Sequence, residues 1–168
     1  MEWFISIVVM LSIIGSLMYV MPSPRERMQS AMRLHARQLG FSVQLVQLEL
    51  PRAKGELEPQ KIRIPVYRSL RPQLSSEAKD TWRTWQVCRV ENVANQGLLP
   101  GWSWKLGEGC LQMAELDQLN ALLEQLPASV LALESTPIHF SVFWRESGGV
   151  EGLDALHSLI QPRVQAKW

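Results

Sequence analysis

The side chains of this sequence that are best suited to chemistry are three histidines and several serines, and their spacing predicts no catalytic or metal site. His35, His139 and His157 form no His-x-x-x-His pair, and none lies beside a cysteine or an acid at metal-ligand spacing. Ser141 and Ser147 lie in no Gly-x-Ser-x-Gly nucleophile turn. We therefore expect no catalytic residue, no bound metal and no cofactor.

The two cysteines, Cys88 and Cys110, form no Cys-x-x-Cys motif. A secreted domain stabilised by disulfides usually carries more cysteines at closer spacing. We expect two buried thiols in a reducing compartment, because a bond between them would need an oxidising environment.

Seven tryptophans are the one compositional excess. Four of them fall in neighbouring candidate strands: Trp82, Trp85, Trp102 and Trp104. One interpretation is packing in the core and across strands. The other is an aromatic binding face for a peptide or a base, since Arg83, Arg89 and Lys105 lie among these tryptophans.

Charge is unevenly distributed in a chain of 168 residues with net charge +1. Residues 22–71 carry ten Lys/Arg and four Asp/Glu, whereas residues 72–168 carry seven and eleven. The acidic C-terminal part argues against nucleic acid as a partner. The length is typical of one domain.

The elements that position these residues begin with a run of nineteen uncharged residues from Trp3 to Met21. As a helix this run would measure about 28 Å, close to the hydrocarbon core of a bilayer. Trp3 and Tyr19 lie near its two ends, where aromatic rings favour the membrane interface. The run has no positive n-region and no small-residue cleavage site, which argues against a signal peptide. The sequence therefore predicts a transmembrane anchor over residues 1–22.

Four arginines follow the run within a short segment: Arg25, Arg27, Arg33 and Arg37. Positive residues beside a span normally stay in the cytoplasm. We therefore expect a single-pass protein of the inner membrane, with the N-terminus outside and the C-terminal domain in the cytoplasm.

Residues 23–40 predict a second, amphipathic helix. Ser23 and Glu26 form a capping box with Pro24 at the first helical position, and Gly40 provides a stop. Two interpretations remain open: the helix lies on lipid headgroups, or it is the first helix of the globular domain.

Residues 41–168 predict an α+β domain with a mostly antiparallel sheet of about five strands and about three helices packed on it. We expect a bulge near Leu45 and Val46, and an edge or irregular position at Pro65. Pro162 is expected to end the last helix. Strands are expected over 41–50, 61–67, 82–90, 101–106 and 138–145, helices over 113–126 and 151–161, and segment 128–134 is ambiguous.

The uncharged run followed by Met21-Pro22-Ser23-Pro24-Arg25 resembles small single-span inner-membrane proteins of proteobacteria. Some of these are labelled as the YajC-type accessory subunit of the preprotein translocase. The resemblance covers about forty residues, and the chain lacks the short lysine-rich helix and Gly-rich β segment of that type. Segments 132–137 and 143–146 resemble gammaproteobacterial proteins without an assigned activity, so the resemblance implies no functional residue.

These observations favour a non-enzymatic, membrane-tethered cytoplasmic interaction or regulatory domain. The expected partners are the lipid bilayer and another membrane or cytoplasmic protein, with weak self-association through Ser12, Gly15 and Ser16 as a further interpretation. The alternatives are an accessory subunit of a secretion or envelope complex and a membrane-associated enzyme. An enzyme would have a pocket with at least two titratable groups of perturbed pKa.

Overall fold

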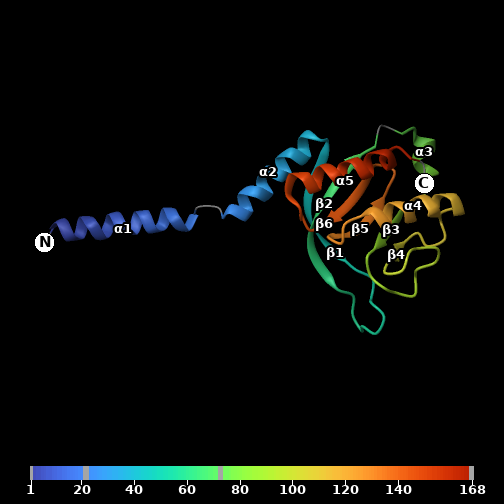
Figure 1. Cartoon of the computed structure of the whole chain (residues 1–168), viewed down its shortest axis with the longest axis horizontal. Helices are drawn as coiled ribbons and strands as arrows, with labels where there is room; N and C mark the ends of the chain where they lie inside the picture. The colour runs from blue at the N-terminus through green and yellow to red at the C-terminus, as the bar shows by residue number, and fades with distance from the viewer. Residues whose placement is uncertain (1, 21–22, 72–73, 167–168) are drawn as a thin grey trace.

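A computed structural model of the chain describes residues 2–20, 23–71 and 74–166, and it describes the side chains of the first helix over residues 3–16. The helices are α1 (Glu2–Val20), α2 (Pro24–Gln38), α3 (Ser76–Asp80), α4 (Met113–Gln125) and α5 (Gly149–Val164). The strands are β1 (Phe41–Glu49), β2 (Lys61–Leu70), β3 (Trp85–Cys88), β4 (Ser103–Leu106), β5 (Val130–Ser135) and β6 (His139–Trp144). Together they form an α+β fold (Figure 1).

The six strands form one antiparallel sheet in the order β1-β2-β6-β5-β3-β4. Three pairs of strands that follow each other in sequence are neighbours in this sheet, namely β1 with β2, β3 with β4 and β5 with β6. The pairings of β2 with β6 and of β3 with β5 join the three pairs into one sheet. The C-terminal strands therefore lie in the middle of the sheet, and the N-terminal strand lies at one edge.

The bulge predicted in β1 is wrong. Pairing with β2 runs without a register shift from Phe41 opposite Ser69 to Glu49 opposite Lys61. Phe41 packs on the helix side of the sheet, whereas Leu48 packs on the opposite side. Because the two ends of the strand bury opposite faces, the apolar pattern changes phase while the backbone stays regular.

The proline of β2 lies inside the sheet, since β2 has β1 on one side and β6 on the other. Pro65 is opposite Leu45 of β1, and the pairing with β6 begins one residue later, at Val66. A residue without an N–H is tolerated there because no ladder bond to β6 is needed. The predicted irregular position is thus the end of the β2–β6 pairing.

The ambiguous segment of the sequence is the sixth strand, β5. It lies between β6 and β3 and is buried on both faces, so it shows a continuous apolar run without alternation. The last helix also differs from the prediction, because α5 continues through Pro162 to Val164.

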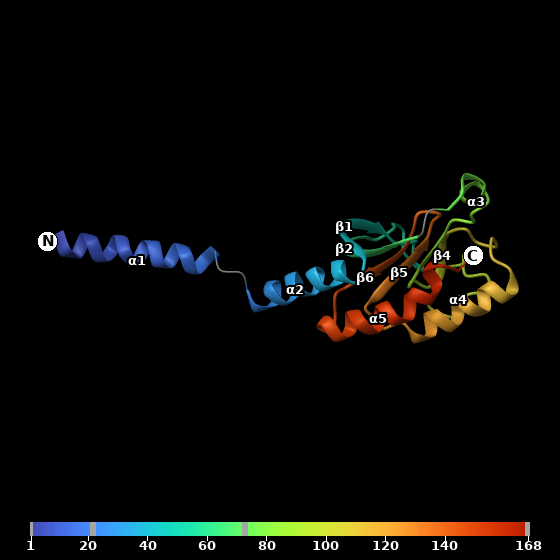
Figure 2. The ribbon, with the colours of Figure 1, turned by 90° about the horizontal axis from the view of Figure 1, so that it is seen from above.

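The main core lies between the sheet and three helices, α2, α4 and α5 (Figure 2). Met32 and Ala36 bring α2 into this core, and Leu119 and Leu153 do so for α4 and α5. The opposite face of the sheet has a smaller cluster, formed by strand residues and the residues directly after them, such as Ile64. Helix α2 therefore packs as part of the globular domain.

Helix α1 lies apart from the sheet and the other helices in both views (Figures 1 and 2). Among the residues that the structure describes, no helix is long and apolar enough to cross a membrane. The predicted transmembrane helix is therefore wrong, and so is the single-pass inner-membrane placement with an outward N-terminus that was based on it.

Candidate functional site

A hollow of about 460 Å³ lies where α2 meets the sheet beside β1 and β2. We call it the basic pocket, because four of its lining residues are arginines: Arg25, Arg33, Arg63 and Arg145. Arg25 and Arg33 come from α2, Arg63 from β2, and Arg145 from the segment directly after β6. The other charged residue lining it is Glu146. Segments far apart in the sequence thus bring five charged side chains to one place.

Glu146 is held by two partners from different elements. Arg33 Nε donates to its Oε1 at 2.7 Å and Arg33 Nη2 donates to its Oε2 at 2.9 Å. The Tyr67 hydroxyl donates to Oε1 at 3.0 Å. The Glu146 side chain is 2% exposed and that of Arg33 is 41% exposed. This two-point pairing neutralises a buried carboxylate and ties α2 to the end of β6.

The same contacts shift the pKa values of both partners. The hydrogen bond to Glu146 raises the pKa of Arg33. Burial, together with the nearby negative charge of Glu146, raises the pKa of Tyr67. Both groups therefore remain protonated at neutral pH, and they act as hydrogen-bond donors to the carboxylate.

Backbone geometry positions Glu146, and ring packing positions Tyr67. Glu146 has φ of 54°, a left-handed conformation that is uncommon for a residue with a side chain. The Tyr67 ring makes edge contacts with Phe41 at 5.9 Å and with Trp144 at 5.4 Å between ring centroids. The Tyr67 hydroxyl therefore connects the paired carboxylate to the aromatic rings of the core.

The remaining three arginines of the basic pocket are free to bind something else. Arg25, Arg63 and Arg145 are exposed, and within the described part of the chain their side chains have no hydrogen-bond or ion-pair partner. Guanidinium groups with unused donors around one hollow attract an anion and hold it with directed hydrogen bonds. The chemistry that this site supports is anion binding.

Two of the four arginines of the basic pocket were already singled out in the sequence, but for a different role. Arg25 and Arg33 were predicted to set membrane topology, together with Arg27 and Arg37. Arg27 is exposed, and Arg37 lines a second hollow on α2 with Arg33. No sequence signal marked Arg63, Arg145 or Glu146, because their meeting depends on strand pairing.

The four tryptophans considered as a binding face lie mostly inside the protein. Trp85, Trp102 and Trp104 are buried, and Trp85 meets Trp104 edge to face at 6.4 Å. Trp82 is half-buried beneath the guanidinium group of Arg71 at 4.2 Å. Their placement matches the packing interpretation, and they present no shared exposed surface.

Both cysteines are free thiols. Cys88 is buried, and burial raises its pKa to about 12. Cys110 is half-buried, and burial raises its pKa as well. Since the thiolate is the reactive form, Cys88 is expected to be inert in the folded protein.

Thiol labelling at pH 8 with a disulfide reagent measures this difference. In a Cys110→Ser variant, we expect Cys88 to react at least about a hundredfold more slowly in the folded state than in denaturant. Its thiolate is scarce and its sulfur is covered. The matched Cys88→Ser variant reports on Cys110 and should react faster. Equal rates for the two variants would contradict the buried position of Cys88.

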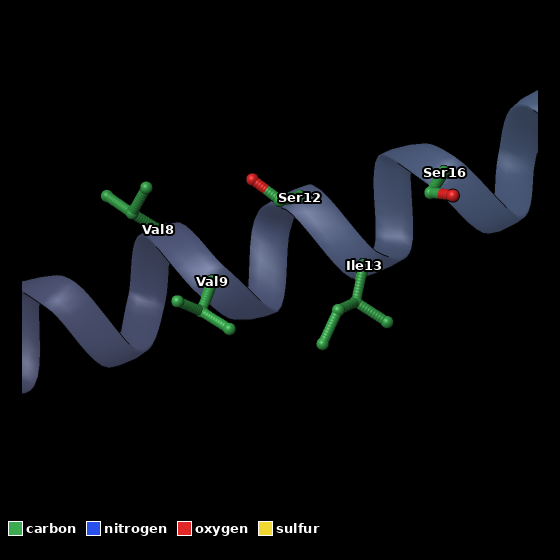
Figure 3. A pocket seen from close by; sticks show the side chains of 5 residues that line it. All are labelled: Val8, Val9, Ser12, Ile13 and Ser16. Carbon is green, nitrogen blue, oxygen red and sulfur yellow. The ribbon is translucent and has the colours of Figure 1, made fainter.

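Helix α1 presents apolar side chains on every side over residues 3–16. A shallow hollow of about 470 Å³ lies on one of its faces, and Figure 3 shows the side chains that line it. Five side chains of the same helix line it: Val8, Val9, Ser12, Ile13 and Ser16. Gly15 is exposed beside it, and a methyl group there would meet nothing within 4 Å. The small residues thus leave a notch on an exposed helix.

The other residues singled out on the first helix are at its ends. Trp3 is exposed. The side chain of Tyr19 and the whole of Met21 lie outside the described part of the chain.

The histidines serve as hydrogen-bonding partners. His35 Nε2 lies 2.8 Å from Asp154 of α5, and His157 Nε2 lies 2.9 Å from the side-chain amide of Gln161. His139 lies 3.0 Å from the Ser141 hydroxyl. Across residues 2–20, 23–71 and 74–166, no three His, Cys, Asp or Glu side chains gather closely enough to hold a metal ion.

Comparisons of the chain with models of protein families, with curated proteins and with solved structures give no match. The resemblance of the first forty residues to the YajC type therefore stays a prediction.

Proposed function

We propose that this protein is a non-enzymatic interaction domain that docks onto another protein through helix α1. The observation that carries the proposal is the exposure of apolar side chains all along this helix. They include Trp3, Phe4, Ile5, Ile7, Val8, Val9, Met10, Leu11, Ile13 and Ile14.

Exposure of this extent is unfavourable in water. Burying one large apolar side chain contributes roughly 1.5–3 kcal/mol, so covering even a few of these residues can stabilise a complex. A helix that is apolar on all sides is normally buried among other elements. The globular domain provides no such cover, since α1 lies apart from it (Figure 1).

The shape of α1 favours a helical partner. Ser12 and Ser16 are one turn apart, and they leave a notch beside the larger Val9 and Ile13 (Figure 3). Side chains of a neighbouring helix pack into such grooves, and small residues allow a close approach. The proposed occupant is therefore an apolar helix, or a group of helices, of a different protein.

The basic pocket supports a binding role more than a catalytic one. The enzyme alternative requires titratable groups poised for proton transfer. Arg33 and Tyr67 have raised pKa values, so both stay protonated at neutral pH and neither can serve as a base. The carboxylate beside them already accepts three hydrogen bonds.

Photocrosslinking of the full chain in its own cells tests the proposal. A photoreactive amino acid is placed at Val9 or at Ile13, and a matched one at Leu57, which is 91% exposed on the globular domain. We expect one discrete partner protein to be crosslinked from the two α1 positions and not from Leu57.

A second experiment distinguishes specific docking of α1 from nonspecific hydrophobic association. With purified partner and full chain, Ile13→Lys should weaken binding by at least about tenfold, because a charge cannot be buried in an apolar contact. Leu57→Lys is the control and should bind normally. Crosslinks only between copies of this chain, or equal binding by Ile13→Lys, would overturn docking onto a different protein.

A further inference from the structure

We propose that the basic pocket binds a phosphomonoester, an organic molecule or side chain that ends in a phosphate group. This inference does not depend on α1 or on its partner. It starts from the charges of the pocket. The positive charge of Arg33 is matched by Glu146, which it contacts through two hydrogen bonds. The charges of Arg25, Arg63 and Arg145 are left without a partner among the described residues.

The three unpaired arginines are carried by fixed backbone positions. Arg63 lies in the continuous pairing of β1 with β2, opposite Gln47. The Arg145 backbone N–H donates to Ser129 at 3.0 Å. Arg25 lies in the first turn of α2, and α2 is held by the Arg33–Glu146 pair. The backbone that carries the three arginines is therefore in place before a ligand binds, which lowers part of the entropic cost of binding.

Three guanidinium groups match a phosphate better than a carboxylate. A carboxylate carries one charge, and a single arginine can satisfy both of its oxygens. A phosphomonoester carries between one and a half and two charges near pH 7 and has three acceptor oxygens. It can therefore accept from donors on three sides and neutralise more of the clustered charge.

The size and lining of the pocket indicate that the phosphate is attached to a larger group. A volume of about 460 Å³ is within the range of sites for small organic ligands and exceeds what one inorganic ion fills. Leu45, which is 50% exposed, and Pro65 give part of the wall an apolar character. We expect the organic part of the ligand to lie against this wall.

Titration calorimetry of the full chain with phenyl phosphate is the direct test. Phenyl phosphate combines the dianion with an apolar ring, and benzoate and inorganic phosphate are compared in parallel. We expect phenyl phosphate to bind more tightly than either, and O-phosphoserine to bind as well if the natural ligand is a phosphorylated side chain. Binding should weaken as the salt concentration rises.

Two variants assign the binding to the pocket. Arg63→Gln and Arg145→Gln should each weaken phenyl phosphate binding by about tenfold, because each removes a charge-assisted hydrogen bond. Arg52→Gln is the control, since Arg52 is exposed and lines a different hollow. Thermal unfolding should be unchanged in all three, because the replaced side chains are exposed.

Three results would overturn the proposal. They are the absence of phenyl phosphate binding, equal binding by the two pocket variants and the Arg52→Gln control, and benzoate binding as tight as that of phenyl phosphate. The last result would identify a carboxylate site, as for an acidic peptide. None of these results bears on docking through α1, which the crosslinking experiment tests separately.

Discussion

The free energy of unfolding is expected to fall by about 2–4 kcal/mol when Arg33 is replaced by methionine. The substitution keeps much of the aliphatic part of the side chain and removes both hydrogen bonds to Glu146. Glu146 would then be a buried carboxylate with only the Tyr67 hydroxyl as a partner. The expected loss lies below that for a fully buried pair because Arg33 is itself 41% exposed and screened by water.

The matched control is Arg37→Met, one turn further along the same helix. Arg37 is exposed, and the described side chains that pair with Glu146 are Arg33 and Tyr67, so replacing Arg37 should change stability by less than about 0.5 kcal/mol. Denaturant unfolding followed by tryptophan fluorescence measures both variants. A similar small loss in the two would mean that the Arg33–Glu146 pair contributes nothing beyond an ordinary surface contact.

Replacing Trp144 by alanine is expected to cost about 3–5 kcal/mol. Trp144 is 1% exposed at the end of β6. Its ring contacts Tyr67 edge to face, and its Nε1 donates to the Ser129 hydroxyl at 2.9 Å. The variant would open a cavity in the main core and remove the edge contact that the Trp144 ring makes with Tyr67.

Trp3→Ala provides the control with the same change of side chain. Trp3 is 70% exposed on α1, so its removal should leave the unfolding of the globular domain within about 0.5 kcal/mol of the parent. Calorimetric unfolding measures both variants. A loss for Trp3→Ala comparable with that for Trp144→Ala would mean that α1 packs on the domain.

The Trp144 and Arg33 variants also test how the pocket is built. Arg33 pairs with Glu146, and the Trp144 ring contacts Tyr67. The Tyr67 hydroxyl in turn donates to Glu146. Because Tyr67 connects them, the losses of the double variant are not expected to be additive.

The local features of the fold could be predicted from short stretches of the sequence. The capping box of α2 is present, with the Ser23 N–H donating to Glu26 at 2.7 Å and the Glu26 N–H donating to the Ser23 hydroxyl at 3.3 Å. Such signals are readable because all their partners lie within one turn. The positions of α4 and β6 agree with the predictions to within one or two residues, because the spacing of apolar residues along one segment indicates each of them.

The prediction made from the length and apolarity of the first helix was wrong. The prediction of a membrane span counted nineteen uncharged residues, whereas no helix among the described residues meets the requirement for crossing a membrane. The apolar side chains of α1 are nevertheless exposed, and a protein partner could cover them.

The contacts between residues far apart in the chain could be seen only in the folded protein. Arg33 and Glu146 are 113 positions apart, and Tyr67 is 79 positions from Glu146. β5 gave no clear pattern because it is buried on both faces in the middle of the sheet. Sequence periodicity reports which face of an element is apolar, but the order of strands depends on long-range pairing that no local pattern encodes. The basic pocket arises from that pairing, which places the arginines of three separate elements around one hollow.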